Sequence, residues 1–176
     1  MNGSQVKSGR AKGGQGEIQG VLDAIRRIVR LLRLASREAE RDVGLSGAQL
    51  FVLQKLSEAK MLSVNELAER THTHQSSVSV VAQALVDKGL VARARAADDA
   101  RRLELTLTSQ AKGLLRKAPG AAQDRLIDAV TRMPGPARKQ LARGLARLVQ
   151  EAGLADDDAP MIFEDASGGK VRGKRV

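Results

Sequence analysis

In the stretch RARAADDARRLELTLTSQAKG, residues Arg93 to Gly113, the side-chain charge changes from basic to acidic and back to basic within a few positions. Arginines flank the acidic pair Asp98 and Asp99, and a strict alternation of leucine with polar residues follows. Alternation is typical of a β-strand with one buried face, and small or acidic residues favour turns. We therefore predict a two-stranded ribbon in which RAADDAR joins LVARA to RLELTLT. One face of the second strand should carry Leu103, Leu105 and Leu107, and the other Arg102, Glu104 and Thr106.

Helices are predicted directly before this ribbon. Ser46 is a good N-cap for LSGAQLFVLQKLSEA, whose leucines recur at helical spacing. LSVNELAERT then predicts a short extended piece and a short helix with Leu67 and Ala68 inward. A further helix from Gln75 to Lys88 follows, and Gly89 suits its C-terminal end. Helix, helix and ribbon is the order of a winged helix-turn-helix.

Further helices are predicted on both sides of this unit. Residues 18–43 form a long amphipathic helix, with apolar residues on one face and arginines on another. Ser109 to Met133 is helical again and bends near Pro119 and Gly120. The segment PGPARKQLARGLARLVQEAGL makes a last helix. Its apolar side carries Leu141, Leu145 and Leu148.

The two ends of the chain have a different composition. Residues 1–16 are rich in Gly and Ser with scattered basic residues, and residues 155–176 are acidic, then basic. Neither segment can bury enough apolar surface to offset the entropy of ordering. We expect disordered tails there and a folded domain over residues 17–154.

Composition limits the classes of function that this chain can have. The 176 residues carry a formal charge of +10, which suggests a polyanionic partner, either nucleic acid or an anionic membrane surface. Without cysteine there are no disulfides or thiol chemistry. No apolar run approaches the length of a membrane span and no signal core is present, so we expect a cytoplasmic protein. No catalytic or cofactor-binding motif is recognisable, which argues against an enzyme and leaves no cofactor to expect.

Several motifs together resemble the MarR family of bacterial transcriptional regulators. The resemblance lies in the order and spacing of the motifs and covers roughly residues 18–154. The matching stretches are GLSGAQLFVLQKL, LSVNELAERT, DKGLVAR and DARRLELTLTSQAKGLL, the last with the wing signature Asp-x-Arg.

The resemblance implies a fold that is mainly α with a small β-hairpin wing. It is a winged helix-turn-helix with a DNA-binding part at about 46–108 and dimerisation helices at about 18–43 and 109–152. It also implies a homodimer that binds double-stranded DNA at a pseudo-palindromic site. Family members are mostly repressors that small anions release from DNA, so a small anionic effector is a further expected partner.

Residues for DNA contact follow from the same resemblance. Arg101 matches the wing arginine that enters the minor groove, where a guanidinium is favoured. Asp99 would hold that arginine, while Asp98 caps the turn. Phosphate contacts are expected from further arginines, and base or phosphate contacts from the start of the recognition helix. The phosphate-contacting arginines are Arg93, Arg95 and Arg102. The residues at the start of the recognition helix are Gln75, Ser76, Ser77 and Ser79.

The chain departs from the family at Val80, where many members carry arginine. Direct reading of guanine by this helix is therefore in doubt, and the valine either touches a thymine methyl or is buried. His72 and His74 lack further metal ligands at a familiar spacing, so we interpret them as surface or phosphate-contacting residues rather than a metal site.

The arginine stripe between Arg26 and Arg41 leaves three interpretations open. It is solvated, or it forms intersubunit salt bridges with Glu38 and Glu40, or it lines an effector pocket. In the last case Arg33 or Arg37 would hold a carboxylate of the ligand.

Two other functions fit the charge. One is a sequence-tolerant architectural DNA-binding protein without an effector, which the Val80 departure and the basic tails favour. The other is an amphipathic protein at a membrane surface, but such helices usually carry Trp or Phe, which are nearly absent here.

Overall fold

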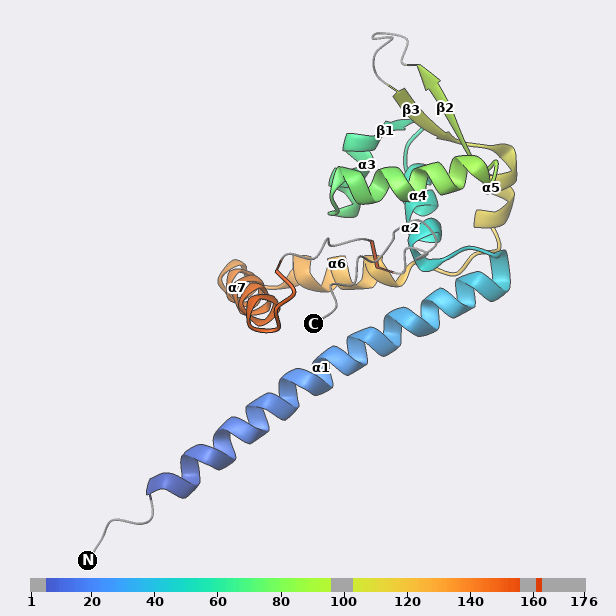
Figure 1. Cartoon of the computed structure of the whole chain (residues 1–176). Helices are drawn as coiled ribbons and strands as arrows, with labels where there is room; N and C mark the ends of the chain where they lie inside the picture. Colours follow the sequence, from blue (N-terminus) through green and yellow to red (C-terminus); the bar gives the residue numbers. More distant parts are fainter. Residues whose placement is uncertain (1–5, 96–102, 156–160, 163–176) are drawn as a thin grey trace, which may run out of the picture.

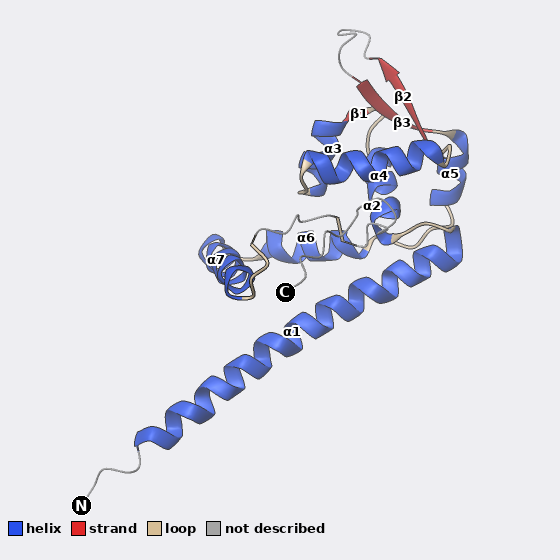
Figure 2. Cartoon of the chain, viewed as in Figure 1, coloured by secondary structure: helices blue, strands red, loops and turns tan. Residues whose placement is uncertain are grey.

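The computed structural model describes residues 6–95, 103–155 and 161–162. These residues form helices with one small antiparallel sheet at one end (Figures 1 and 2). None of the helices described is long and apolar enough to cross a membrane. In chain order the elements are α1 (Val6–Val43), α2 (Gly47–Ser57), β1 (Leu62–Ser63), α3 (Val64–Thr71), α4 (Gln75–Asp87), β2 (Val91–Arg95), β3 (Leu103–Leu107), α5 (Ser109–Leu115), α6 (Ala122–Arg132) and α7 (Gly135–Glu151).

Helix α1 begins at Val6, so residues 6–16 are helical where the composition predicts disorder. Once a helix exists, each added residue contributes one more backbone hydrogen bond, and extension is far easier than nucleation. The helix passes beneath the rest of the molecule, and its N-terminal half projects beyond it (Figure 1). Leu32 and Ala39, in the C-terminal half, are buried.

Helix α2 lies at the centre of the core. Its N-terminus is fixed by a reciprocal capping box, in which Ser46 accepts from the Gln49 backbone N–H and the Gln49 side chain accepts from that of Ser46. This confirms Ser46 as the N-cap. Phe51 and Leu53 are almost fully buried, and the core extends from them to α3, α4 and the sheet.

The sheet has the strand order β1-β3-β2. Both predicted ribbon strands are present, with Val91 opposite Leu107 and Arg95 opposite Leu103. The predicted faces are only partly right, because Leu103 is 47% exposed and Glu104 only 8% exposed. Leu103 lies at the outer end of the ribbon, beyond the core. Glu104 lies in the central strand of the sheet, opposite Ser63 of β1 and Ala94 of β2.

The segment after the ribbon is interrupted rather than bent. Helix α5 ends at Leu115 and α6 starts at Ala122, with Pro119 between them, which cannot donate a helical hydrogen bond. Gln54 of α2 holds the break from the side. Its Nε2 donates to the Pro119 carbonyl at 2.8 Å, and its Oε1 accepts from the Ala121 N–H at 3.0 Å. Sequence patterns do not reveal this clamp, because the partners are far apart in the chain.

The C-terminal region contributes to the core at one point outside the predicted domain. Met161 is buried among the core residues, although residues 155–176 are predicted to be disordered. Next to it, the Ile162 carbonyl accepts a hydrogen bond from Gln123 Nε2 at 3.4 Å. An apolar side chain that reaches the core can order a polar segment locally, because its burial offsets part of the entropy cost.

Candidate nucleic-acid interface

The turn between α3 and α4 sets the angle between these helices. The Thr71 hydroxyl donates to the Leu67 carbonyl at 2.8 Å, inside the last turn of α3. His72 then adopts a left-handed conformation with φ of 51°, which ends the helix and reverses the chain. His74 occupies the N-cap position of α4. Across the described residues, no three His, Cys, Asp or Glu side chains gather closely enough to hold a metal ion.

Helix α4 has one packed face and one free face. Val78, Val81 and Leu85 are buried against the core. The first residues of the helix point outward, and Val80 is 49% exposed, so the alternative that this valine is buried is wrong. Of the predicted contact residues on this helix, Gln75, Ser76 and Ser79 are exposed and Ser77 is partly buried.

A hydrogen bond between Lys88 and Gln49 joins the C-terminal end of α4 to α2. The sequence motifs did not indicate this contact. Lys88 Nζ donates to Gln49 Oε1 at 2.8 Å, so Gln49 caps α2 and holds the end of α4 at once. Gly89 follows with φ of 69° and leads the chain into β2. Gln49, the first of the two glutamines in GLSGAQLFVLQKL, was the available signal, since a buried amide needs hydrogen-bond partners.

The wing is described only at its base. Arg93 and Arg95 are exposed on β2, which packs against α4. Arg93 and Arg95 therefore belong to the same packed unit as the exposed face of α4. A single DNA interface would require this arrangement. Asp98, Asp99, Arg101 and Arg102 lie outside the described residues, so their roles stay predictions.

A salt bridge from α2 links the helix-turn-helix to α6, and two more lie beside it. Lys55 of α2 bridges Glu58 at 2.8 Å and Asp124 of α6 at 2.7 Å, and Arg70 of α3 approaches Glu58 at 3.8 Å. Burial, the largest single influence, lowers the pKa of Lys55, but the hydrogen bonds to Asp124 and Glu58 outweigh it and raise that pKa. Lys55 thus stays charged at neutral pH, joining α2 to α6.

The arginines of α1 are not gathered into a site within the subunit. Arg33 and Arg37 are both exposed to solvent, and neither has a pairing carboxylate at salt-bridge distance among the described residues. Arg41 pairs with its neighbour Asp42 at 2.8 Å, and this hydrogen bond raises the pKa of the guanidinium. The single subunit therefore fits the solvated interpretation of the stripe.

Comparison with known families finds a match for the DNA-binding part of the chain. Residues 43–102, which run from the end of α1 through the helix-turn-helix into the wing, match the model of the MarR family. This part of the chain is similar to the MarR family. The predicted fold class, a mainly α winged helix-turn-helix with a small β wing, is confirmed.

The chain is also similar to individual DNA-binding regulators. The chain is 36% identical over 94 residues to the HTH-type transcriptional repressor MdtR of Bacillus subtilis, covering 53% of this chain and 59% of that repressor. It is 27% identical over 122 residues to the HTH-type transcriptional repressor Rv2887 of Mycobacterium tuberculosis, covering 69% and 88%. In fold it is similar to Sco3205, a MarR family transcriptional regulator from Streptomyces coelicolor solved in complex with DNA. That match has a TM-score of 0.54 at 23% identity, over 84% of this chain and 94% of the other.

Proposed function

We propose that this protein is a homodimeric transcriptional repressor of the MarR family that binds a pseudo-palindromic DNA operator. One observation carries the proposal: α4 is packed on one side and presents Gln75, Ser76, Ser79 and Val80 on the other. A helix in a major groove needs such a free face at its N-terminal end. The formal charge of +10 favours association with a polyanion.

The proposed contacts divide by type. Base contacts come from the start of α4, where Val80 is accessible to a thymine methyl. Phosphate contacts come from Arg93 and Arg95, joined in the wing by Arg102. Arg101 enters the minor groove and Asp99 orients it.

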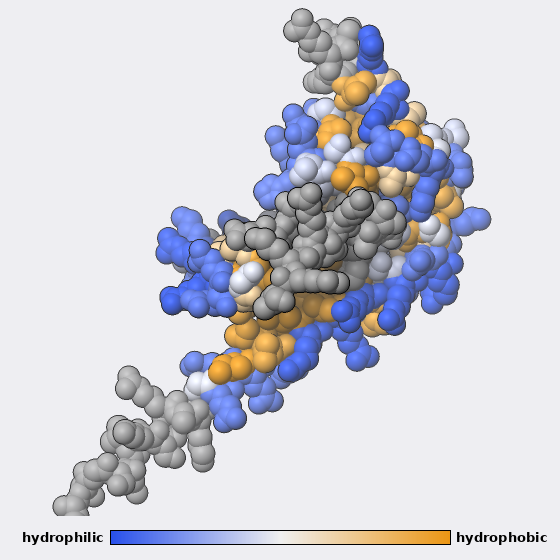
Figure 3. Space-filling model, in the orientation of Figure 1, coloured by the Kyte–Doolittle hydropathy of each residue, from blue (hydrophilic) through white to orange (hydrophobic). Residues whose placement is uncertain are grey.

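Homodimerisation is supported by apolar surface that a lone subunit leaves open. Hydrophobic side chains gather along α1 where it leaves the body (Figure 3), and α7 buries none of its residues. A soluble monomer rarely exposes so large an apolar area, and a second copy would cover it. We propose that residues 18–43 and 125–154 form this interface. The exposed apolar residues there include Ile18, Val21, Leu22, Ile28, Leu141, Leu145, Leu148 and Val149.

A small anionic effector remains part of the proposal. Arg33 and Arg37 are its proposed ligand-binding residues, and both lie on the helix that the second subunit would pack against. Because both are exposed in one subunit, only the dimer could enclose a ligand there.

Arg101→Ala is expected to weaken operator binding by about 1–3 kcal/mol while the protein stays folded, because the minor-groove guanidinium is lost. Asp99→Ala should weaken binding less, since it only orients the arginine. Binding is measured by fluorescence anisotropy on the footprinted site. Lys117→Ala, which removes one unit of charge just after α5, is the control. Wild-type affinity in Arg101→Ala would show that the wing assignment is wrong.

The ratio of specific to random-sequence affinity tests the function itself. A repressor that reads two half-sites should prefer its operator by roughly 10³-fold or more at physiological salt. The measurement compares the DNA upstream of the protein's own gene with shuffled DNA of equal length at several salt concentrations. Equal affinities and equal salt slopes, with no preferred site in a genome-wide footprint, would instead support the sequence-tolerant architectural protein. The exposed residues at the start of α4 carry no charge, and this observation favours the second candidate.

A further inference from the structure

Helix α1 carries a row of arginines in its middle turns. Between Asp23 and Glu38 the sequence holds five arginines and no acidic residue, and all five arginines are exposed. Because an α-helix rises about 1.5 Å per residue, the row is about 17 Å long. We call this row the arginine ridge, and its members are Arg26, Arg27, Arg30, Arg33 and Arg37.

The arginine ridge lies away from the side by which α1 packs. Leu32 is buried against the subunit. Helical spacing continues the apolar face of Leu32 through Val29, Ile25 and Val21. Arg30 stands two residues before Leu32, so it lies about 200° around the helix from that leucine. A second subunit that covers the apolar face would leave the ridge open, and Figure 3 shows hydrophilic side chains along the outer edge of α1.

The arginine ridge has little counter-charge. Arg26 pairs with Asp23 in the preceding turn, but none of the other four arginines has an acidic partner at salt-bridge distance among the described residues. Phosphates of one DNA strand recur about every 3.4 Å along the duplex axis, so the ridge spans about five of them. A guanidinium matches the geometry of a phosphate group. The ridge therefore fits the backbone of a nucleic acid in both charge and length.

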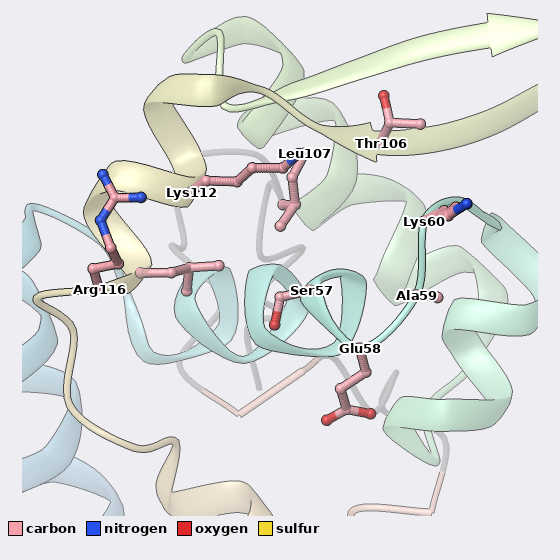
Figure 4. Close-up of a pocket in the computed structure, with 9 residues that line it drawn as sticks. Ser57, Glu58, Ala59, Lys60, Thr106, Leu107, Lys112 and Arg116 are labelled. Atoms are coloured by element: carbon pink, nitrogen blue, oxygen red, sulfur yellow. The ribbon is translucent and has the colours of Figure 1, made fainter.

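The recognition helix lies on another side of the molecule. Helices α2 and α6 lie between α4 and α1 (Figure 1), so a duplex held by α4 would not reach the ridge. Another group of cations, Lys60, Lys112 and Arg116, lines an open pocket between α2, β3 and α5 (Figure 4). Those cations surround a hollow in the DNA-binding part, whereas the ridge presents a line of charge on an exposed helix.

We propose that the arginine ridge binds the phosphates of a second DNA duplex, so that one dimer bridges two DNA segments. For the first duplex, held by α4 and the wing, the inference rests on the proposed function. Once that duplex is bound, a second segment of the same DNA is present at a high effective concentration. Weak phosphate contacts that do not depend on sequence are then sufficient to hold the second segment.

The test measures recruitment of a second duplex by a protein that already holds the first. Beads carry the operator duplex in excess over the full-length protein, so that the recognition helices are occupied. A labelled duplex of shuffled sequence is then added at several salt concentrations. Wild-type protein is expected to recruit the labelled duplex, and the affinity of recruitment should fall steeply as salt rises.

Arg27→Gln/Arg30→Gln is expected to lower the affinity for the second duplex at least about tenfold, because two phosphate contacts are lost. The salt slope of recruitment should become shallower by about 2. Affinity for a single operator duplex should stay within about twofold of wild type, since both arginines lie far from α4. The control, Lys139→Gln/Arg143→Gln, removes the same charge from exposed positions of α7 and should recruit like wild type.

Neither variant changes Arg33 or Arg37, which the proposed effector site also uses, and circular dichroism checks that both variants fold. Wild-type recruitment by the ridge variant, or an equal loss in the α7 control, would overturn the inference. Binding of the operator complex to phosphatidylglycerol vesicles without recruitment of a duplex would also overturn it, and would indicate a membrane surface instead. Capture on the operator beads without recruitment would overturn the inference alone, whereas no capture would overturn the proposed function and the inference with it.

Discussion

Leu145→Glu is expected to turn the proposed dimer into monomers and to abolish operator binding. Leu145 is 49% exposed in the subunit, between Leu141 and Leu148 on the apolar side of α7. A second subunit would bury it, and a carboxylate without a partner in an interface costs several kcal/mol. The dimer dissociation constant should rise at least about 100-fold. Sedimentation equilibrium over a range of protein concentrations measures this change.

The control for Leu145→Glu is Gln150→Glu, which makes the same change from neutral to negative. Gln150 lies on the side of α7 opposite to Leu148 and Leu141 by helical spacing, so it should leave assembly intact. Circular dichroism should show the same helix content in both variants. A wild-type protein that sediments as a folded monomer at micromolar concentration would contradict the proposed dimer.

Phe51→Ala is expected to lower the free energy of unfolding by about 3–5 kcal/mol. The ring is 2% exposed at the centre of α2, and the ammonium of Lys55 lies 5.7 Å from its centroid. Truncation removes buried apolar contacts and leaves a cavity between helices and sheet. Urea denaturation at one fixed protein concentration measures the change, since the proposed dimerisation would make apparent stability depend on concentration.

Met61→Ala provides the matched comparison for Phe51→Ala. Met61 is an exposed apolar residue in the loop before β1, and its truncation should change stability by no more than about 0.5 kcal/mol. If Phe51→Ala costs less than about 1 kcal/mol, the packing of α2 in the core is not as described.

The winged helix was predictable because its signals are local. Ser46 begins α2 through its own side chain, and Gly89 takes the left-handed conformation that ends the recognition helix. The alternation around Leu105 needs only neighbouring residues to indicate a strand. These features depend on short segments, so one sequence is enough to find them.

What could not be predicted depends on contacts between distant segments. Gln54 holds the break at Pro119, and Glu104 lies in a strand that pairs with β1 on one side and β2 on the other. Lys60 and Lys112 share a pocket although separate elements carry them. Periodicity describes which face of an element is apolar, but it does not say which other element covers that face.

Helix α1 has two different surroundings along its length. Near Leu32 and Ala39 it packs into its own subunit, so a substitution there changes folding. Toward Ile18 it projects beyond the body, and under the proposed assembly a substitution there changes only the choice of partner. After a gene duplication, drift at this projecting end would let two paralogues stop exchanging subunits while both keep the same DNA-binding module. Separate regulatory circuits could then diverge without any change in the residues that read DNA.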